Sequence, residues 1–328
     1  MKSWRFSAFG PLKNLQLEEI SIPVPAPDEC LLKLEYAGLN PADRLLIAGR
    51  YPTSGIPPFS VGRDGCGIVC VAPAGGRFKP GDRVVCLNSI VGIERDGTFA
   101  EYVAVPEAHL AAIPDWWSPQ DGAAGTLVLL TVWQALVDAA NLRAGETVVI
   151  SGASGGVGVA ALIVANALGA RVIALSRSTE KQQRLRELGA SCAFGPEDDE
   201  LVGRIRELGG ADVVIDSVGG AFLAQAMEMT NAYARICVVG ALGGKLSSID
   251  ATQLIYKRLQ VHGIHVGMYA PERAQIAWSR MCDVLAPSRA RVPIDRIFPF
   301  ENVHEAFAHL RMGPMGKVLI GPIGDKGG

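Results

Sequence analysis

The stretch Thr147-Val-Val-Ile-Ser-Gly-Ala-Ser-Gly-Gly-Val-Gly158 decides the fold of the second part of the chain. A continuously apolar run passes directly into a glycine-rich turn, and the small and apolar residues Val159–Gly169 have the composition of a buried helix. Gly155 permits a tight turn with close backbone approach, and Gly158 lets the helix pack against its strand. Because free amides at the start of such a helix attract a pyrophosphate, we expect a dinucleotide site here rather than a turn without a ligand. Its residues are Ser154, Gly155, Gly156, Val157 and Gly158, and Ala153 stands where the usual G-x-G-x-x-G pattern has its first glycine.

More units of the same kind follow this turn. Short apolar runs alternate with segments of helical character such as Thr179–Leu188, and the runs are Arg171–Leu175, Asp212–Asp216 and Arg235–Val239. This alternation implies right-handed crossovers and a parallel sheet. Continuously apolar strands indicate a sheet that helices cover on both faces. The sequence therefore predicts an α/β, doubly wound Rossmann domain at residues 122–266.

The chain before Asp121 has the pattern of a mostly β domain. Runs of alternating character, separated by turn sequences such as Pro80-Gly-Asp82, extend from Trp4 to Pro114. These runs are Gln16–Ile22, Cys30–Tyr36, Gly67–Val71 and Arg83–Leu87.

From Gly267 the chain is expected to return to this first domain. The predicted elements are a helix at Met268–Leu285, an extended segment at Ile294–Phe300, an amphipathic helix at Val303–Arg311, a final strand at Gly316–Ile320 and a frayed tail at Asp325–Gly328. Residues 1–121 and 267–328 would together form the mostly β domain.

Composition excludes several classes of protein. Of the 328 residues, 49% are hydrophobic and 20% charged, which is typical of a globular protein. The formal net charge of -2 and the absence of a basic stripe argue against a nucleic-acid partner. The uncharged stretch Thr147–Ala170 is no membrane span, because half of it is the glycine turn.

The seven cysteines are odd in number and scattered, which indicates reduced thiols and a cytoplasmic location. Cys66 and Cys70 are four residues apart and could pair on a metal ion. Their place in an alternating strand favours two buried thiols instead.

The end of the second strand of the predicted sheet selects between the two nicotinamide cofactors. An acidic residue there would bond the ribose hydroxyls and repel a 2′-phosphate. This chain has Leu175-Ser-Arg-Ser-Thr-Glu-Lys181, in which Ser176 can bond a phosphate oxygen while Arg177 and Lys181 supply positive charge. The alternative is a solvated helix start with both cations merely exposed. We expect the cofactor to be NADP(H).

Motifs in a fixed order extend over nearly the whole chain. They are Gly38-Leu-Asn-Pro-Ala-Asp43, Gly49-Arg-Tyr-Pro52, Gly81-Asp-Arg-Val84, Gly97-Thr-Phe-Ala-Glu-Tyr102, Leu130-Thr-Val-Trp133, the glycine turn, Asp216-Ser-Val-Gly-Gly220 and Gly316-Lys-Val318. In these motifs the chain resembles the zinc-independent branch of the medium-chain dehydrogenase/reductase superfamily, which holds quinone oxidoreductases and enoyl thioester reductases. The resemblance implies a GroES-like catalytic domain beside the Rossmann domain. It also implies a homodimer formed by sheet extension, through the strand at Leu259–Ile264.

The residues that bind zinc in other branches of this superfamily are replaced. Zinc-dependent relatives have a Cys where this chain has Asn40, and Gly-His-Glu where it has Gly62-Arg-Asp64. Neither sulfur nor imidazole is available at these positions. The structural zinc lobe of those relatives needs four cysteines after Gly81-Asp-Arg-Val84, where only Cys86 occurs. The sequence therefore predicts no metal site.

Reduction of a conjugated double bond suits such a site better than alcohol oxidation, because no Lewis acid is needed to stabilise an alkoxide. By resemblance, Tyr51 assists protonation, as a tyrosine at this spacing does in enoyl thioester reductases; the alternative is a loop aromatic that covers the cleft. Asn40, by resemblance, lies beside the nicotinamide and orients the ring or the substrate carbonyl; the alternative is an Asn that caps the turn before Pro41. Asp43 is expected to organise that turn.

Further cofactor contacts come from the resemblance alone. Thr131 is expected near the nicotinamide, and Lys317 approaches from the last strand. The remaining residues of this set are Gly240, Ala241, Leu242, Ile264, His265 and Val266, which follow predicted parallel strands. His265 could act as an acid, but a backbone contact is expected of it.

Three functions compete on this sequence. The first is NADPH-dependent reduction of a quinone, enone or similar conjugated carbonyl compound. The second is reduction of a 2-enoyl thioester, for which Arg44, Arg50 and Arg63 would supply a basic entrance. Against it stand Val128, where thioester reductases have Asn, and Ile264-His265, where they have Phe-Trp. The third is a non-catalytic NADPH-binding sensor or structural protein.

Overall fold

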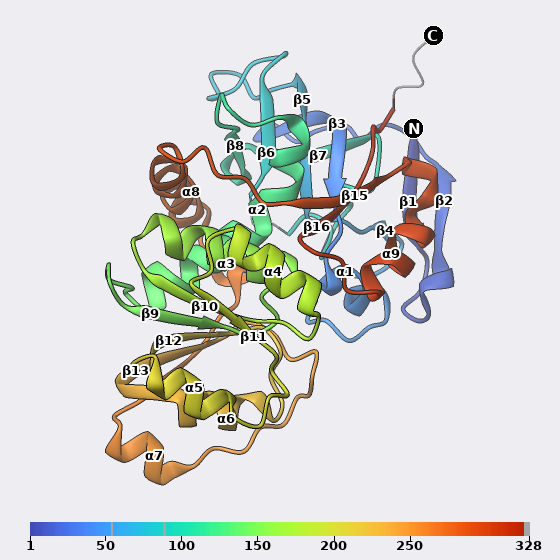
Figure 1. The fold of residues 1–328 in the computed structure, drawn as a ribbon. Coiled ribbons are helices and arrows are strands. Elements are labelled where there is room, and N and C mark those ends of the chain that lie inside the picture. The colour runs from blue at the N-terminus through green and yellow to red at the C-terminus, as the bar shows by residue number, and fades with distance from the viewer. Residues whose placement is uncertain (54, 88–89, 325–328) are drawn as a thin grey trace. The chain divides into compact units, whose positions relative to one another are not determined.

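The computed structural model describes residues 1–53, 55–87 and 90–324, so the expected tail at Asp325–Gly328 lies outside the described residues. The chain divides into two compact units (Figure 1). Unit 1 holds residues 1–127, 267–279 and 293 onward, and unit 2 holds residues 128–266 and 280–292. The domain boundaries that the sequence suggests, after 121 and after 266, stay a prediction.

Unit 2 contains a sheet of six parallel strands in the order β11-β10-β9-β12-β13-β14. Its strands are β9 (Thr147–Ile150), β10 (Arg171–Leu175), β11 (Cys192–Phe194), β12 (Ala211–Asp216), β13 (Thr230–Val238) and β14 (Gln260–Gly263). Its helices are α3 (Gly156–Ala167), α4 (Thr179–Glu187), α5 (Leu201–Glu207), α6 (Phe222–Met229) and α7 (Ala251–Tyr256). The first strand, β9, lies in the middle of the sheet, and the chain winds outward from it in both directions, which confirms the predicted doubly wound topology.

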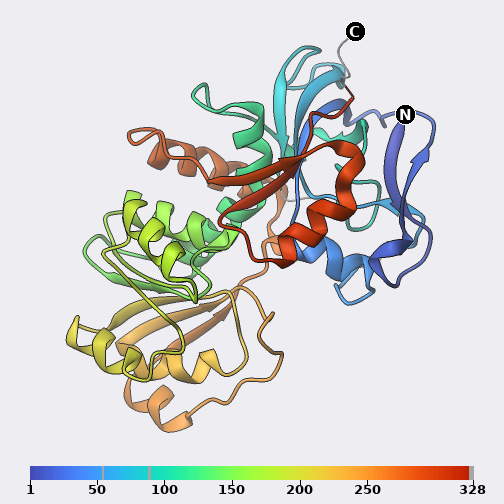
Figure 2. The same cartoon turned by 45° about the vertical axis from the view of Figure 1, so that its right-hand side comes forward.

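Helices cover both faces of this sheet. Figures 1 and 2 show α3 and α4 on one face and α5 and α6 on the other. All four residues of β9 are buried, as the continuously apolar run predicts. Helix α3 begins at Gly156 rather than at Val159, because Gly155 is its extended N-cap residue and the glycines after it already have helical geometry.

Unit 1 is built mainly from antiparallel strands. A three-stranded sheet has the order β2-β1-β4, and a larger sheet has the order β15-β16-β3-β5-β6-β8, with β7 paired to β3. The strands are β1 (Lys2–Phe6), β2 (Leu15–Glu19), β3 (Glu29–Gly38), β4 (Phe59–Ser60), β5 (Asp64–Val71), β6 (Arg83–Cys86), β7 (Tyr102–Pro106), β8 (Leu110–Ala112), β15 (Ile294–Phe298) and β16 (Lys317–Ile320). Helices α1 (Pro41–Ile47) and α9 (Val303–Arg311) belong to this unit, and α2 (Pro119–Trp133) and α8 (Pro271–Leu285) each have residues in both units. The mostly β, GroES-like class is confirmed.

Three strand ends meet at one place in the larger sheet. Strand β3 ends at Gly38, which pairs with Asp64, the first residue of the antiparallel strand β5. Strand β16 is also antiparallel to β3, and its Leu319 pairs with Gly38. The residues at these ends, Asn40, Asp64 and Lys317, are therefore brought together although they are far apart in the chain.

The pairing of β3 with β5 corrects one expectation about the cysteines. Cys66 is buried, but Cys70 is exposed. The register shifts here, because Leu31 pairs with Val71 while Leu32 pairs with Val69, and Cys70 is left without a partner position on β3. Regular alternation stops at this irregularity, so the two thiols do not share an environment.

One apolar helical stretch in the described part of the chain, Pro119–Ala139, is long enough to cross a membrane. Of its most apolar window, 72% is buried inside the protein, as in the core helix of a globular fold. It is a different stretch from the uncharged segment Thr147–Ala170, which forms β9, the glycine turn and α3.

Gly158 is the position where packing of α3 tolerates no side chain. A Cβ atom there would lie 2.4 Å from the carbonyl oxygen of Gly152 and 2.5 Å from Ala153 Cα. We expect Gly158→Ala to lower the free energy of unfolding by about 1–3 kcal/mol through overpacking. The matched control is Gly203→Ala in α5, where a Cβ would meet nothing within 4 Å; it should stabilise the protein by roughly 0.5–1 kcal/mol. Urea denaturation measures both, and equal effects would contradict the packing argument.

Candidate active site

A cluster of buried polar side chains lies in unit 1 where β3, β5 and β16 meet. Asp43 and Asp64 have no exposed surface, and Lys317, Asn40 and Arg63 are also buried. Ionised groups removed from water are tolerated only when they are paired and hydrogen-bonded. The contacts within this cluster therefore define its chemistry.

Lys317 and Asp64 form a buried ion pair. Lys317 Nζ lies 2.8 Å from Asp64 Oδ2 and donates a second hydrogen bond, of 2.7 Å, to Asn40 Oδ1. The amide nitrogen of Asn40 donates to the same Asp64 oxygen at 3.0 Å. The other carboxylate oxygen accepts the backbone N–H of Leu127 at 2.7 Å. Three side chains and one backbone amide thus close a network in which both carboxylate oxygens are used.

The Asn-Pro-x-Asp sequence folds as the start of helix α1. Asn40 is the extended N-cap residue, Pro41 takes the first helical position, and Asp43 Oδ2 accepts the backbone N–H of Asn40 at 2.8 Å. Burial raises the pKa of Asp43 from 3.8 to about 7, although the Asn40 hydrogen bond and the positive charges of Arg63 and Lys317 oppose this shift. Asp43 Oδ1 is buried without a hydrogen-bond partner.

Tyr51 is held by Arg63. Arg63 Nη1 donates a 2.9 Å hydrogen bond to the phenol oxygen, and the guanidinium carbon lies 5.6 Å from the centre of the Tyr51 ring. Tyr51 is half-buried against the core of unit 1. Of the three arginines considered for a basic entrance, Arg50 is exposed and Arg44 half-buried, whereas Arg63 is buried on Tyr51.

In unit 2 the glycine turn follows the carboxyl end of β9. Gly152 has a positive φ of 58°, and a Cβ there would lie 2.6 Å from Ser217 Oγ. No side chain caps the N-terminus of α3, and its first turn holds no acidic residue. Backbone N–H groups of this kind fit a phosphate group.

A serine and aspartate network supports the back of this turn, and the sequence reasoning did not identify it. Asp216 Oδ1 accepts hydrogen bonds from Ser151 Oγ at 3.0 Å and from the backbone N–H groups of Val218 and Gly219, both at 2.9 Å. Ser217 Oγ donates to the carbonyl of Ser151 at 2.7 Å. The signal was the Asp216-Ser-Val-Gly-Gly220 motif, which links the end of β12 to the end of β9.

The end of β10 carries the residues expected at a 2′-phosphate. Ser176 is buried, Arg177 is exposed, and Lys181 is half-buried in the first turn of α4. Two further residues organise this end: Ser178 caps α4 by accepting the backbone N–H of Lys181 at 3.3 Å, and Gln182 Nε2 donates to the carbonyl of Ser176 at 2.8 Å. A serine before the helical segment, a preferred N-cap residue, was visible in the sequence, whereas the Gln182 contact was not.

Apart from Asn40 and Lys317, which belong to unit 1, the other expected cofactor contacts lie in unit 2 as well. Thr131 is buried in α2, and the remaining residues follow the carboxyl ends of β13 and β14. Of these, Gly240 and Ile264 are half-buried, Val266 is buried, and Ala241, Leu242 and His265 are exposed. Ends of neighbouring parallel strands share one edge of a sheet, which is where doubly wound folds bind ligands.

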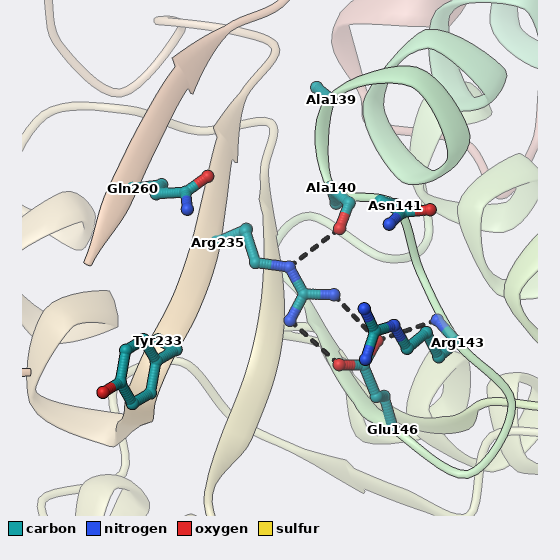
Figure 3. Close-up of a pocket in the computed structure, with 8 residues that line it drawn as sticks. All are labelled: Ala139, Ala140, Asn141, Arg143, Glu146, Tyr233, Arg235 and Gln260. Carbon is teal, nitrogen blue, oxygen red and sulfur yellow. Dashed lines mark hydrogen bonds and ion pairs between the residues drawn. The ribbon is translucent and has the colours of Figure 1, made fainter. Parts of the chain in front are cut away.

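A cavity of about 350 Å³ in unit 2 lies away from that edge. Figure 3 shows Arg235 reaching from β13 toward Ala140 and Glu146, and Arg235 Nη2 is 2.7 Å from Glu146 Oε2. Glu146 precedes β9, and Gln260 in the cavity wall is the first residue of β14. The cavity therefore belongs to the amino-terminal side of these strands, opposite the glycine turn.

Within 1–53, 55–87 and 90–324, no group of three or more His, Cys, Asp or Glu side chains is arranged to hold a metal ion. At the positions of the zinc ligands in zinc-dependent relatives, the structure has Asn40 and Asp64 bound to Lys317, and Arg63 bound to Tyr51.

The fold and the two sets of residues define a two-part dehydrogenase or reductase. Residues 156–283 match the family model of zinc-binding dehydrogenases, and residues 26–115 match that of the alcohol dehydrogenase GroES-like domain.

Several proteins are similar to this chain over nearly its full length. The chain is 31% identical to quinone oxidoreductase-like protein 2 of Bos taurus, over 97% of this chain and 93% of that protein. It is 26% identical to the quinone oxidoreductase of Homo sapiens, over 98% of this chain and 97% of that protein. A solved structure of a mycobacterial protein complexed with NADPH superposes with a TM-score of 0.87 at 25% identity, covering 98% of this chain and 99% of that one. The chain belongs to the medium-chain dehydrogenase/reductase superfamily and is an oxidoreductase of its quinone oxidoreductase-like group.

The raised pKa of Asp43 predicts a pH dependence of stability. Because the pKa is higher in the folded protein, about 7 against 3.8, the folded state holds this proton more tightly. Its stabilising contribution is complete below about pH 4 and is lost as the pH rises through 7, by at most about 1.4 kcal/mol per pH unit. Asp43→Asn keeps an oxygen for the Asn40 N–H and should flatten the unfolding free energy over this range.

The opposite pH dependence of stability is expected of Asp250. The backbone N–H groups of Gln253 and Thr252 at the start of α7 lower the pKa of this carboxyl group. Asp250→Asn should remove a contribution that is present above the ordinary pKa and lost as the pH falls. Urea denaturation from about pH 2 to 8 compares the two variants, because the Asp250 contribution is lost below its ordinary pKa of 3.8 and the Asp43 contribution above that value. A wild-type slope retained in Asp43→Asn would disprove the assignment.

Proposed function

We propose that the protein is an NADPH-dependent reductase of quinones, enones or similar conjugated carbonyl compounds, and that it works without zinc. The donor set at the meeting point of β3, β5 and β16 carries this proposal. Where zinc-dependent relatives place sulfur and imidazole, this chain has an amide, Asn40, locked to an ammonium group, and a guanidinium, Arg63, bonded to a phenol. These are hydrogen-bond donors and acceptors rather than the ligands that zinc prefers.

Such a set suits the reduction of an activated C=C bond. When bound, NADPH supplies a hydride to the β carbon of the substrate. Negative charge then develops on the carbonyl oxygen, where hydrogen-bond donors stabilise it. Tyr51 delivers the proton, to the α carbon of an enone or to an oxygen of a quinone, and Arg63 holds its hydroxyl in place.

We propose that the cofactor binds along the glycine turn and the neighbouring strand ends of unit 2. The uncapped helix α3 fits the pyrophosphate, and Ser176, Arg177 and Lys181 fit the 2′-phosphate. The remaining proposed contacts with the cofactor are Asn40, Thr131, Gly240, Ala241, Leu242, Ile264, His265, Val266 and Lys317. The mycobacterial relative complexed with NADPH supports this choice of cofactor.

We further propose a cytoplasmic homodimer. Strand β14 lies at one edge of the six-stranded sheet, with Val261 exposed, and the side chains of Ile255 and Tyr256 in α7 are exposed as well. An exposed edge strand with apolar side chains is a surface on which a second copy can extend the sheet.

The substrate class is tested by NADPH oxidation with 1,4-benzoquinone, a simple enone and crotonyl-CoA. Tyr51→Phe should lower kcat on the preferred acceptor about 100-fold, because it removes the proton donor. Tyr233→Phe is the matched control, since Tyr233 is an exposed tyrosine of unit 2 beside Arg258. Turnover confined to crotonyl-CoA would favour the thioester reductase. NADPH binding without turnover on any of the three would indicate a sensor or structural protein.

The preference for NADPH is tested at the end of β10. Arg177→Ala should raise the Michaelis constant for NADPH about tenfold and leave that for NADH unchanged, because a charge-assisted hydrogen bond to the 2′-phosphate is lost. Arg184→Ala removes an exposed charge from α4, the helix that follows Arg177, and should change neither constant. An equal effect of Arg177→Ala on both cofactors would refute the phosphate contact.

A further inference from the structure

The amide of Asn40 has most of its hydrogen-bonding capacity committed inside the protein. Its nitrogen donates to Asp64 Oδ2 at 3.0 Å and, more weakly, to the carbonyl of Gly38 at 3.4 Å. Its oxygen accepts from Lys317 Nζ at 2.7 Å. An amide offers two N–H donors and two acceptor lone pairs. Both donors are therefore engaged. The Asn40 side chain also faces the Asp43 backbone N–H in the capping box of α1 but forms no hydrogen bond with it, so one lone pair on the oxygen remains.

The charges of Lys317 and Asp64 determine the orientation of the Asn40 amide, with its oxygen toward Lys317 and its nitrogen toward Asp64. An ammonium group can only donate hydrogen bonds, and an ionised carboxylate can only accept them. A flipped Asn40 would place its N–H groups against Lys317 Nζ and its oxygen against the Asp64 carboxylate. Two favourable contacts would become two repulsive ones, in a place where all three side chains are buried.

We propose that Asp64 and Lys317 are positioning residues that fix the polarity of Asn40, so that Asn40 acts on a ligand as a hydrogen-bond acceptor and not as a donor. This deepens the proposed function and rests on it. The group that Asn40 recognises carries an N–H: the carboxamide of the nicotinamide offers one, whereas a substrate carbonyl oxygen does not. Asn40 thus orients the cofactor ring, and stabilisation of the substrate oxygen falls to other donors.

A cofactor analogue isolates this contact. In the 3-acetylpyridine analogue of NADP⁺ a methyl group replaces the carboxamide nitrogen, so the N–H donors are gone and the rest of the molecule is kept. Calorimetric titration of the wild-type protein should give a Kd for NADP⁺ about tenfold lower than for the analogue. The measurement needs no turnover.

The key variant is the double substitution Asp64→Asn with Lys317→Met. It leaves no unpaired charge, and the amide introduced by Asp64→Asn can still accept the Leu127 N–H. Of the contacts that orient the Asn40 amide, only the weak 3.4 Å hydrogen bond to the Gly38 carbonyl then remains. Each single substitution should lower Tm, and the double variant should recover part of that loss because neither charge is left buried alone. Its preference for NADP⁺ over the analogue should fall below twofold, and kcat should stay at least tenfold below wild type.

Two further variants separate positioning from stability. Lys317→Arg keeps a donor-only cation at this site and should keep the tenfold preference. Glu146→Gln breaks the ion pair with Arg235 on the amino-terminal side of β9; it should lower Tm without changing the preference or kcat.

The proposal is overturned if the wild-type protein binds NADP⁺ and its analogue equally. It is also overturned if the double variant keeps the preference, or recovers kcat together with Tm. Failure of the proposed function has a different signature. A wild-type protein that prefers NADP⁺ tenfold but reduces no quinone or enone would refute the substrate class and support the role of Asp64 and Lys317.

Discussion

The buried ion pair between Lys317 and Asp64 is the interaction on which the rest of unit 1 depends. It joins β5 to β16 through two side chains that are 253 positions apart in the chain. Asn40 and the Leu127 N–H complete its hydrogen bonds. Removing one partner of such a pair leaves a buried charge without compensation, which costs about 3–5 kcal/mol. The same contacts immobilise the end of β3, so the segment from Asn40 to Tyr51 begins from a fixed point.

Charge balance in this cluster extends beyond the pair. Arg63 and Lys317 contribute two positive charges, and Asp43 and Asp64 two carboxyl groups, all of them buried. Below the pKa of about 7 that burial gives Asp43, the carboxyl group is neutral and the four side chains carry a net charge of +1. A positive cluster in a low-dielectric environment stabilises negative charge that develops nearby during a reaction. The raised pKa of Asp43 and the net positive charge of the cluster thus have a common origin in burial.

Sequence reasoning predicted those features that depend on neighbours in the chain. The glycine turn, the apolar strands of unit 2 and helix Val303–Arg311 follow from local pattern, and the structure contains them. It predicted Asn40 and Tyr51 as site residues and missed Asp64 as the partner of Asn40 and Lys317, because these residues are distant in the chain and no local pattern pairs them. Cys70 was misjudged for a related reason, since a register shift between two strands is invisible in either strand alone. The Asp216 network escaped notice because its serine and backbone partners lie on two different strand ends.

The two units build their parts of the site in different ways. In unit 2 the constraint acts on residue type, because a side chain at Gly158 would collide with Gly152. In unit 1 the decisive property is the orientation of one amide, which residue type leaves open and the surrounding charges determine. Replacement of zinc ligands in a sequence also does not show whether a cation remains. In this chain a cation does remain, in the form of the Lys317 ammonium group, which is 2% exposed and bound to Asn40 and Asp64. Unlike a catalytic zinc ion, it is no Lewis acid, and two of its three N–H donors are used inside the protein. It therefore holds Asn40 and Asp64 in a fixed arrangement, as a point charge with directed N–H bonds rather than as a coordination centre.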